Sequence, residues 1–465
     1  MNRSATTALV GDAPKGGSVL SFYAAQGTPR PPRVDRAHGL YLWDKTGKRY
    51  LDATSGAVVV NIGHGNAHVL AAMREQAQRV TFAYPRFFES EHNVLLSDRI
   101  CALAGEGFDR AFFVSGGSEA NEAAIKLARQ YAVVTGQPQR TKVISRNPSY
   151  HGSTLGAVAV TGDTSTHALY GPMVTDQPKV AAPLSYRLPA GHTQESFEAA
   201  CAQELERAIE HAGAENVLAF ILEPIGGLST GAVVSSGRYF QEVREICNRH
   251  GVLLIFDEIM CGAGRTGKFL SAHHWEGASP DLVTLAKGLA AGYTPLGALL
   301  APNRIVDAVA ASGGFVHGHT YFTNPLSCAV ANAVLDEVVE HKLVERAALS
   351  GEYLRGRLQE LAVRSPLVGD VRGRGLLQAI ELVSDKLKKT QLPAGLNVPA
   401  RLTHHGLVHG IALYNRRANK GEFGDFQMIA PPLTASESEL DELVHLLELA
   451  LRDLHHELHA QGLVE

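Results

Sequence analysis

Residues whose side chains or backbone could take part in catalysis or anion binding stand at or just after the ends of four short apolar runs of this 465-residue chain. Gly117 and Ser118 come after the run 110–115, Tyr150 after 141–146, Asp257 at the end of 251–258, and Lys287 at the end of 282–288. A glycine pair before a hydroxyl can leave backbone N–H groups free to bind an anion. A lysine at the end of an apolar strand loses hydration, which lowers its pKa and suits Schiff-base chemistry.

Each of these residues also has a plainer interpretation. Ser118 could be a helix N-cap, Tyr150 a packed loop residue, and Lys287 a strand-end side chain that reaches solvent. The set is more specific than its members, because an anion site, an aromatic ring, a carboxylate and an amine occur in that order. Pyridoxal 5'-phosphate needs these four groups: one for its phosphate, one for its ring face, one for its pyridine nitrogen and one for its aldehyde.

The elements that must position these residues alternate between strand and helix from about residue 66 to residue 315. Continuous apolar runs, which include VLAFILEP (217–224), predict strands, and the stretches 118–134 and 236–250 predict helices. Apolar strands with helices between them favour a mostly parallel sheet that is covered on both faces. Ligands of such sheets bind beyond the carboxyl ends of the strands.

The two ends of the chain follow other patterns. Residues 1–19 are small and polar, and the stretch 39–57 has the alternation and turn residues of a hairpin. After about residue 325, amphipathic helices are expected within 329–362 and 436–460. Short strand-like pieces lie between them, at 376–383, 411–415 and 426–433. We therefore expect an N-terminal arm and hairpin (1–65) that joins a smaller α+β domain (326–465), with a large cofactor-binding domain (66–325) between them.

Composition disfavours several classes of protein. Lys and Arg number 43 against 47 Asp and Glu, which leaves no positive field for nucleic acid. The longest uncharged run, 288–303, is broken by glycine and proline and is too short to span a membrane, and the start of the chain lacks a signal-peptide core. Five scattered cysteines favour a reducing compartment, and we expect a cytoplasmic protein with no membrane or nucleic-acid partner. These cysteines are Cys101, Cys201, Cys247, Cys261 and Cys328.

Two other features of the sequence resemble a nucleotide site or a metal site but lack residues or spacing that such a site needs. The segment 262–268 (GAGRTGK) resembles a nucleotide-binding phosphate loop, but Phe269 stands where a Ser or Thr must reach the metal. A nucleotide-binding ATPase is therefore a distant alternative. The histidine pairs 273/274, 404/405 and 455/456 lack the helical spacing of zinc ligands, so no metal site is expected.

A resemblance to a known family rests on a longer set of motifs. They are SGGSEAN (115–121), YHG (150–152), EP (223–224), LIFDEI (254–259), GRTG (264–267), LAKG (285–288) and HGHTY (317–321). The chain resembles the class III pyridoxal-phosphate aminotransferases, the group of the ω-amino acid:pyruvate and ornithine transaminases, over roughly residues 20–455. The resemblance implies an α/β chain with the type I aspartate-aminotransferase fold, a large domain with a mostly parallel sheet and a smaller α+β domain. It also implies a homodimer, or a tetramer built from such dimers.

The resemblance also assigns roles to residues around the cofactor. It makes Lys287 the Schiff-base lysine and proton shuttle, and Asp257 the partner of the pyridine nitrogen. Gly117 and Ser118 would bind phosphate, and Thr320 would complete the phosphate site of the neighbouring subunit. Ile259 would pack on the ring face opposite Tyr150.

Substrate contacts follow from the same resemblance. Phe22, Tyr150 and Arg416 are assigned to the substrate pocket, with Arg417 as the alternative to Arg416 beside the insertion 418–426. The strip 55–60 departs from amine transaminases, which often have an aromatic residue there. The expected activity is transfer of an amino group from an ω-amino acid or amine to a keto acid, with pyruvate as the expected acceptor. An aminomutase or racemase of the same fold is the alternative.

Overall fold

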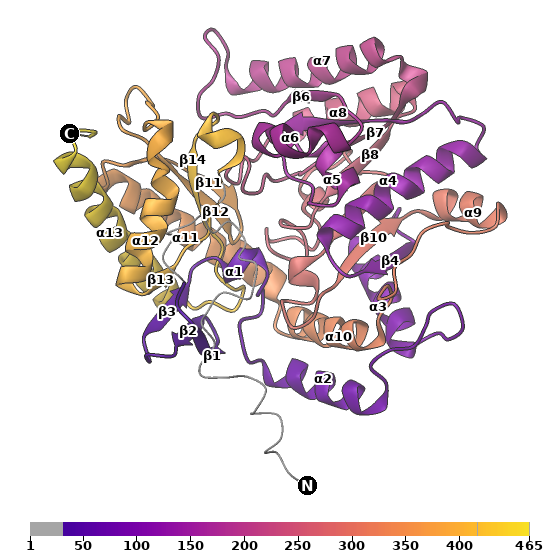
Figure 1. Ribbon diagram of the computed structural model, residues 1–465, viewed down its shortest axis with the longest axis horizontal. Helices are drawn as coiled ribbons and strands as arrows, with labels where there is room; N and C mark the ends of the chain where they lie inside the picture. The colour runs from indigo at the N-terminus through magenta and orange to yellow at the C-terminus, as the bar shows by residue number, and fades with distance from the viewer. Residues whose placement is uncertain (1–30, 416, 465) are drawn as a thin grey trace.

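The computed structural model describes residues 31–415 and 417–464 and shows two lobes (Figure 1). Phe22 and Arg416 therefore lie outside the described residues. The lobe at the right of Figure 1 holds the largest sheet with α4 and α8, and the lobe at the left holds β11, β12, β14 and the C-terminal helix α13. The short helix α1 (Ser55–Val58) lies between the two lobes in this view.

The largest sheet has seven strands in the order β4-β10-β9-β8-β7-β5-β6. All pairings from β9 to β6 are parallel, whereas β10 is antiparallel to both of its neighbours. The fold is therefore α/β with a mostly parallel sheet, as predicted. The strands are β4 (Arg110–Val114), β5 (Lys142–Asn147), β6 (Lys179–Ala181), β7 (Val217–Leu222), β8 (Leu253–Asp257), β9 (Leu282–Leu285) and β10 (Gly297–Ala301).

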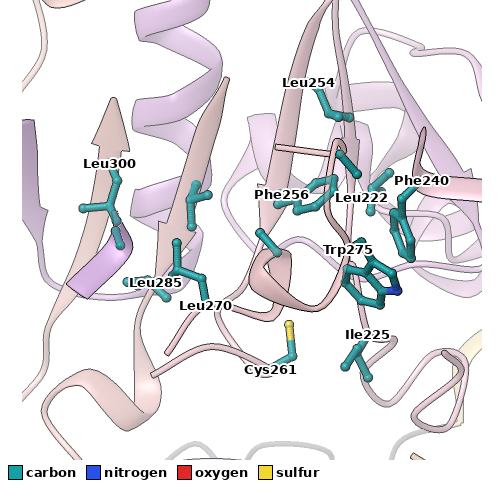
Figure 2. Close-up of a cluster of buried hydrophobic side chains, with 14 of the residues drawn as sticks. Leu222, Ile225, Phe240, Leu254, Phe256, Cys261, Leu270, Trp275, Leu285 and Leu300 are labelled. Carbon is teal, nitrogen blue, oxygen red and sulfur yellow. The ribbon is translucent and has the colours of Figure 1, made fainter. Parts of the chain in front are cut away.

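Helices cover both faces of this sheet, which explains why its central strands β7, β8 and β9 are largely apolar. Alternate residues of a strand point to opposite faces. On β8, Phe256 packs in the core that includes Phe240 and Trp275, whose rings lie 4.0 Å apart (Figure 2). Ile255 packs in a second core with Leu127 of α4. The helices around the sheet are α3 (Glu91–Ala104), α4 (Gly117–Val134), α5 (Leu155–Val160), α6 (Thr164–Tyr170), α7 (Gln194–Ala212), α8 (Gly237–His250) and α9 (Asn303–Ala311).

The remaining strands form two smaller sheets. The predicted hairpin is present as β2 and β3, and its turn is held by Asp44, whose side chain accepts the N–H of Thr46 at 2.8 Å. The orders are β1-β2-β3-β13 and β11-β12-β14, and β3 runs parallel to β13. These strands are β1 (Val34–His38), β2 (Tyr41–Asp44), β3 (Arg49–Asp52), β11 (Val368–Arg374), β12 (Leu377–Leu382), β13 (Ile411–Ala412) and β14 (Asp425–Ile429).

The helical stretch 329–362 is divided in two, because Lys342 adopts the left-handed conformation with φ +48°. Leucines of the helices that follow it pack in a core of their own with Leu51 and Ile411. No helix within 31–415 and 417–464 is both long and apolar enough to cross a membrane. The other long helices are α2 (Ala67–Arg79), α10 (Pro325–Glu340), α11 (Leu343–Arg364), α12 (Val398–His409) and α13 (Glu437–Ala460).

Candidate active site

One cavity of about 460 Å³ lies at the carboxyl ends of the strands of the largest sheet. Its wall contains Gly117, Ser118, Tyr150, Asp257, Ile259 and Lys287, six of the seven residues that the sequence assigned to a cofactor. The seventh, Thr320, is exposed and does not line this cavity. The fold thus gathers residues that are up to 170 positions apart, because parallel strands end at the same edge.

The anion side of the cavity is the start of α4. The first N–H groups of a helix lack partners within it and carry partial positive charge. Gly117 begins this helix after Gly116, and the Ser118 hydroxyl accepts the N–H of Ser153 at 3.0 Å. A side chain at Gly117 would place its Cβ 2.9 Å from Ile259, so glycine lets Ile259 approach the helix start.

Asp257 is 4% exposed and holds its carboxylate through three donors. The Oδ2 atom accepts from His151 Nδ1 at 2.8 Å and from Asn121 Nδ2 at 2.8 Å. The Oδ1 atom accepts the N–H of Ile259 at 3.1 Å. These donors hold the carboxylate in one orientation at this position. His151 and Asn121 belong to the motifs on which the family resemblance rests. A histidine or an asparagine alone, however, does not show that its hydrogen-bond partner is Asp257.

Lys287 lies just beyond β9 with φ +46°, in the left-handed region that non-glycine residues rarely adopt. Burial lowers the pKa of its amine from 10.5 to about 8, while the carboxylates of Asp257 and Glu223 oppose this shift. The next residue, Gly288, has no room for a side chain, since its Cβ would lie 2.1 Å from Asn61 Nδ2. The chain therefore presents an amine that is largely neutral at mildly alkaline pH.

Glu223 is a site residue that the sequence did not assign. Its carboxyl group lies in the cavity wall and is 6% exposed, and burial raises its pKa. It accepts N–H groups of Gly227 at 3.1 Å and of Tyr150 at 3.3 Å. The only signal for Glu223 in the sequence was the Glu-Pro pair at the end of the run 217–224. A glutamate at that place can be either a carboxylate of the site or a cap at the strand end, and the residue type does not distinguish the two.

These groups fit pyridoxal 5'-phosphate. The cavity has the volume of a small-ligand site. The positive helix start at Gly117 suits a phosphate, the ionised Asp257 suits a protonated ring nitrogen, and the Lys287 amine suits an aldehyde. The Aminotransferase class-III family profile matches residues 22–451. This chain belongs to the class III aminotransferases.

Known members of the family are similar over almost their whole length. The putrescine–pyruvate aminotransferase of Pseudomonas aeruginosa is 36% identical over 90% of this chain and 90% of its own. The (S)-enantioselective ω-transaminase of Thermomicrobium roseum is 39% identical, with a TM-score of 0.86 over 91% of this chain and 93% of that chain. An amine transaminase of an uncultivated Pseudomonas species, solved in its pyridoxal-phosphate-bound form, is 35% identical, with a TM-score of 0.88 over 94% and 99% of the two chains.

The cofactor of this aminotransferase is pyridoxal 5'-phosphate, as in its solved relatives. Gly117 and Ser118 would hold its phosphate, and Asp257 its ring nitrogen. Tyr150 and Ile259 would enclose its ring, and Lys287 would bind its aldehyde carbon. When bound, the cofactor supplies an aldehyde that takes up the amino group and a ring that accepts electrons from the substrate carbon.

The other sequence candidates lie elsewhere in the aminotransferase. Arg417 donates to Asp425 Oδ1 at 2.7 Å and does not line the cavity. The segment 262–268 forms turns that are buried over 262–266, and its Arg265 donates to the Leu376 carbonyl at 3.1 Å, so this arginine joins two parts of the chain. Among the described residues, no three His, Cys, Asp or Glu side chains come together as a metal site would require.

Proposed function

We propose that this aminotransferase moves an amino group from an ω-amino acid or amine to a keto acid, with pyruvate as its acceptor. The observation that carries the proposal is the Lys287 amine, which shares one cavity with the Asp257 carboxylate and the start of α4. The similarity to a putrescine–pyruvate aminotransferase and to ω-transaminases supports an amine donor and pyruvate.

The residues of this chain divide the chemistry between them. A neutral Lys287 amine attacks a carbonyl carbon and, when released by the incoming amine, takes a proton from the substrate carbon and returns it. Asp257 keeps a proton on the ring nitrogen, which makes the ring a stronger electron acceptor. Tyr150 is half-buried in the cavity wall, where its ring would cover one face of the cofactor.

Exchange with single substrates tests this proposal. The purified enzyme, mixed with one amine or ω-amino acid, should lose its visible absorption band and release a free keto or aldehyde product. Adding pyruvate should restore the band, and a panel with 2-oxoglutarate in parallel ranks the acceptors. A change of substrate configuration or amino-group position without free keto product would instead indicate a racemase or an aminomutase.

For the substrate carboxylate we propose Arg416, a planar side chain that can hold two carboxylate oxygens at once. The ion pair between Arg417 and Asp425 supports this choice, since it engages the alternative residue. Arg416→Ala should raise the KM for pyruvate at least tenfold and change the half-reaction of a carboxylate-free amine less than threefold. Arg417→Ala serves as the matched variant, and a larger effect of that change on the KM for pyruvate would move the role to Arg417.

The assembly that we propose is a homodimer in which Thr320 reaches the phosphate site of the other subunit. Thr320 is exposed, and exposed aromatic side chains follow it at Tyr321 and occur in the segment 82–88. Tyr321 is 65% exposed and its ring lies 5.9 Å from that of Phe82, while Phe87 and Phe88 are 73% and 66% exposed. Exposed aromatic groups of this kind mark protein interfaces. We also place the enzyme in the cytoplasm, because its five cysteines are free.

A further inference from the structure

A buried chain of hydrogen bonds leads from Thr284 to the carboxylate of Asp257. Thr284 Oγ1 donates to Asn121 Oδ1 at 2.8 Å, and Asn121 Nδ2 donates to Asp257 Oδ2 at 2.8 Å. Thr284 and Asn121 are both 0% exposed. Thr284 does not line the active-site cavity, so any effect that it has on the cofactor must pass through other residues.

The sheet register places Thr284 beside Asp257. The two residues are paired across the parallel strands β9 and β8, and the Thr284 carbonyl accepts the N–H of Glu258 at 2.9 Å. Asn121 reaches down from the second turn of α4 and bonds both of them. Three elements of the fold therefore meet at this one amide.

The Thr284 hydroxyl holds the oxygen end of the Asn121 amide, whose nitrogen end faces Asp257. An amide oxygen only accepts hydrogen bonds, an amide nitrogen only donates, and an ionised carboxylate only accepts. The NH₂ group therefore faces the two acceptors, Asp257 and the His151 carbonyl at 2.7 Å, and the Thr284 hydroxyl directs its proton at Oδ1. In the flipped orientation the amide oxygen would face a buried negative charge, which is costly in a low dielectric.

We propose that Thr284, acting through Asn121, is a positioning residue for Asp257. Together with His151, the amide occupies Oδ2 and fixes the carboxylate plane. Oδ1 accepts only the Ile259 N–H among the described residues and remains available to the ring nitrogen of the cofactor. The inference rests on the proposed role of Asp257 and adds the residues that keep that role in place.

The test compares two variants of the holoenzyme, one without the hydroxyl of Thr284 and one without its methyl group. Thr284→Val keeps the shape of the side chain and removes the hydroxyl, whereas Thr284→Ser keeps the hydroxyl and removes a methyl group. The matched control is Ser145→Ala, because the Ser145 hydroxyl on β5 is buried and has no hydrogen-bond partner within the described residues. The readout is a pH titration of the visible absorption band of the bound cofactor. This band reports whether the nitrogen that joins Lys287 to the cofactor carries a proton.

Thr284→Val should move the midpoint of this titration upward by at least half a pH unit. When Asp257 is held less firmly, the ring nitrogen of the cofactor keeps its proton less well and the ring is less positive. The nitrogen that joins Lys287 to the cofactor then repels its own proton less and keeps it to higher pH. The same variant should slow the amine half-reaction about tenfold with less than a twofold change in KM. Thr284→Ser and Ser145→Ala should both titrate like the wild type.

Two outcomes would overturn the proposal. One is an unchanged midpoint and half-reaction in Thr284→Val. The other is an equal loss in Thr284→Ser and Thr284→Val, which would show that the side chain serves packing alone. The titration needs only bound cofactor, so it still judges the positioning role if no tested amine reacts. A failure of the proposed substrate class is thereby kept distinct from a failure of this inference.

Discussion

At the scale of single residues, the site combines an amine whose burial favours its neutral form with a carboxylate that is held by hydrogen bonds. Burial destabilises the ammonium form of Lys287, whereas three hydrogen-bond donors hold the Asp257 carboxylate in place. The carboxylate alone would raise the pKa of the amine, so desolvation outweighs this attraction. The result is a nucleophile that is neutral in a pH range where an ordinary lysine is charged.

The pKa of Lys287 predicts how fast the apoenzyme captures its cofactor. Only the neutral amine attacks the aldehyde, and this form dominates above pH 8 instead of above pH 10.5. The rate of covalent capture, followed by stopped-flow absorbance, should rise with pH and level off after a midpoint near 8. Butylamine mixed with free pyridoxal phosphate in the same buffers corrects for the titration of the cofactor itself. A corrected midpoint above 10 would contradict the assignment of the buried amine.

Asp257→Asn tests the charge of the carboxylate with little change in its shape. The amide cannot hold a proton on the ring nitrogen, so the ring becomes a weaker electron acceptor. We expect cofactor binding to persist and the half-reaction with an amine donor to slow by at least a thousandfold. Single-turnover absorbance measures the rate, and equilibrium dialysis measures cofactor retention. A near-normal rate would mean that Asp257 acts only as a cap at the end of β8.

At the scale of elements, the sequence indicates the strand ends well because they carry two signals at once. The run that ends at Asp257 is continuously apolar, the run that ends at Lys287 is apolar except for Thr284, and each stops at a charged residue. The strand β10 has no such signal, since Gly297–Ala301 lies in a long uncharged stretch with glycine and proline. Likewise, nothing in the stretch 329–362 marks Lys342 as the break between α10 and α11.

The roles of His151, Asn121 and Glu223 could not be predicted for a different reason. Each depends on a contact between segments far apart in the sequence, such as the 136 positions between Asn121 and Asp257. Hydrogen-bond partners of this kind are set by sheet order and register, which local patterns do not contain. The type of chemistry was therefore predictable, whereas the groups that hold its carboxylate in place were not.

Arg265 joins elements that belong to different parts of the chain. This side chain is 0% exposed and donates to Leu376 O at 3.1 Å, to Asn61 Oδ1 at 2.6 Å and to Pro431 O. Burial lowers its pKa to about 9, against the opposing charge of Asp52. One guanidinium thus connects the segment after α1 with the turn before β12 and with the segment after β14.

Arg265→Lys should lower the Tm by several degrees. An ammonium keeps the charge but lacks the forked donors, and each buried acceptor left unpaired costs about 1–3 kcal/mol. Arg238→Lys is the matched control, because the Arg238 side chain is 80% exposed and pairs with Glu242 one helical turn away. Differential scanning fluorimetry at fixed protein and cofactor concentration measures both variants. Equal Tm values would show that the acceptors of Arg265 find other donors.

At the scale of the whole molecule, a complete site is expected only in an assembly of two chains. Lys287→Ala spoils the site of its own subunit, and Thr320→Ala spoils the site of the other subunit if the proposed dimer forms. A mixed dimer then carries both defects in one site and neither in the second site. We expect it to recover up to about half of the activity of a wild-type dimer, in line with two-fold symmetric pairing.

Differently tagged subunits, mixed and purified through both tags, allow this activity to be measured on heterodimers alone. Each parental variant, carried through the same exchange, sets the background. Heterodimers that form but stay at this background would show that Thr320 serves its own subunit. The same preparations, run by light scattering, report whether the unit is a dimer or a tetramer.

The parallel pairing of β3 with β13 has a consequence for how the chain is made. The Ser55 hydroxyl donates to the carbonyl of Ala430, 375 positions later, and Leu51 is paired with Ile411. Ribosomes add roughly 5–20 residues per second, so the N-terminal hairpin emerges on the order of tens of seconds before its partner strand. During that interval the edge of β3 is open to strands of other nascent chains. A chain truncated before Ile411 would therefore be an aggregation-prone fragment with an unpaired β3 edge, and not a shorter active enzyme.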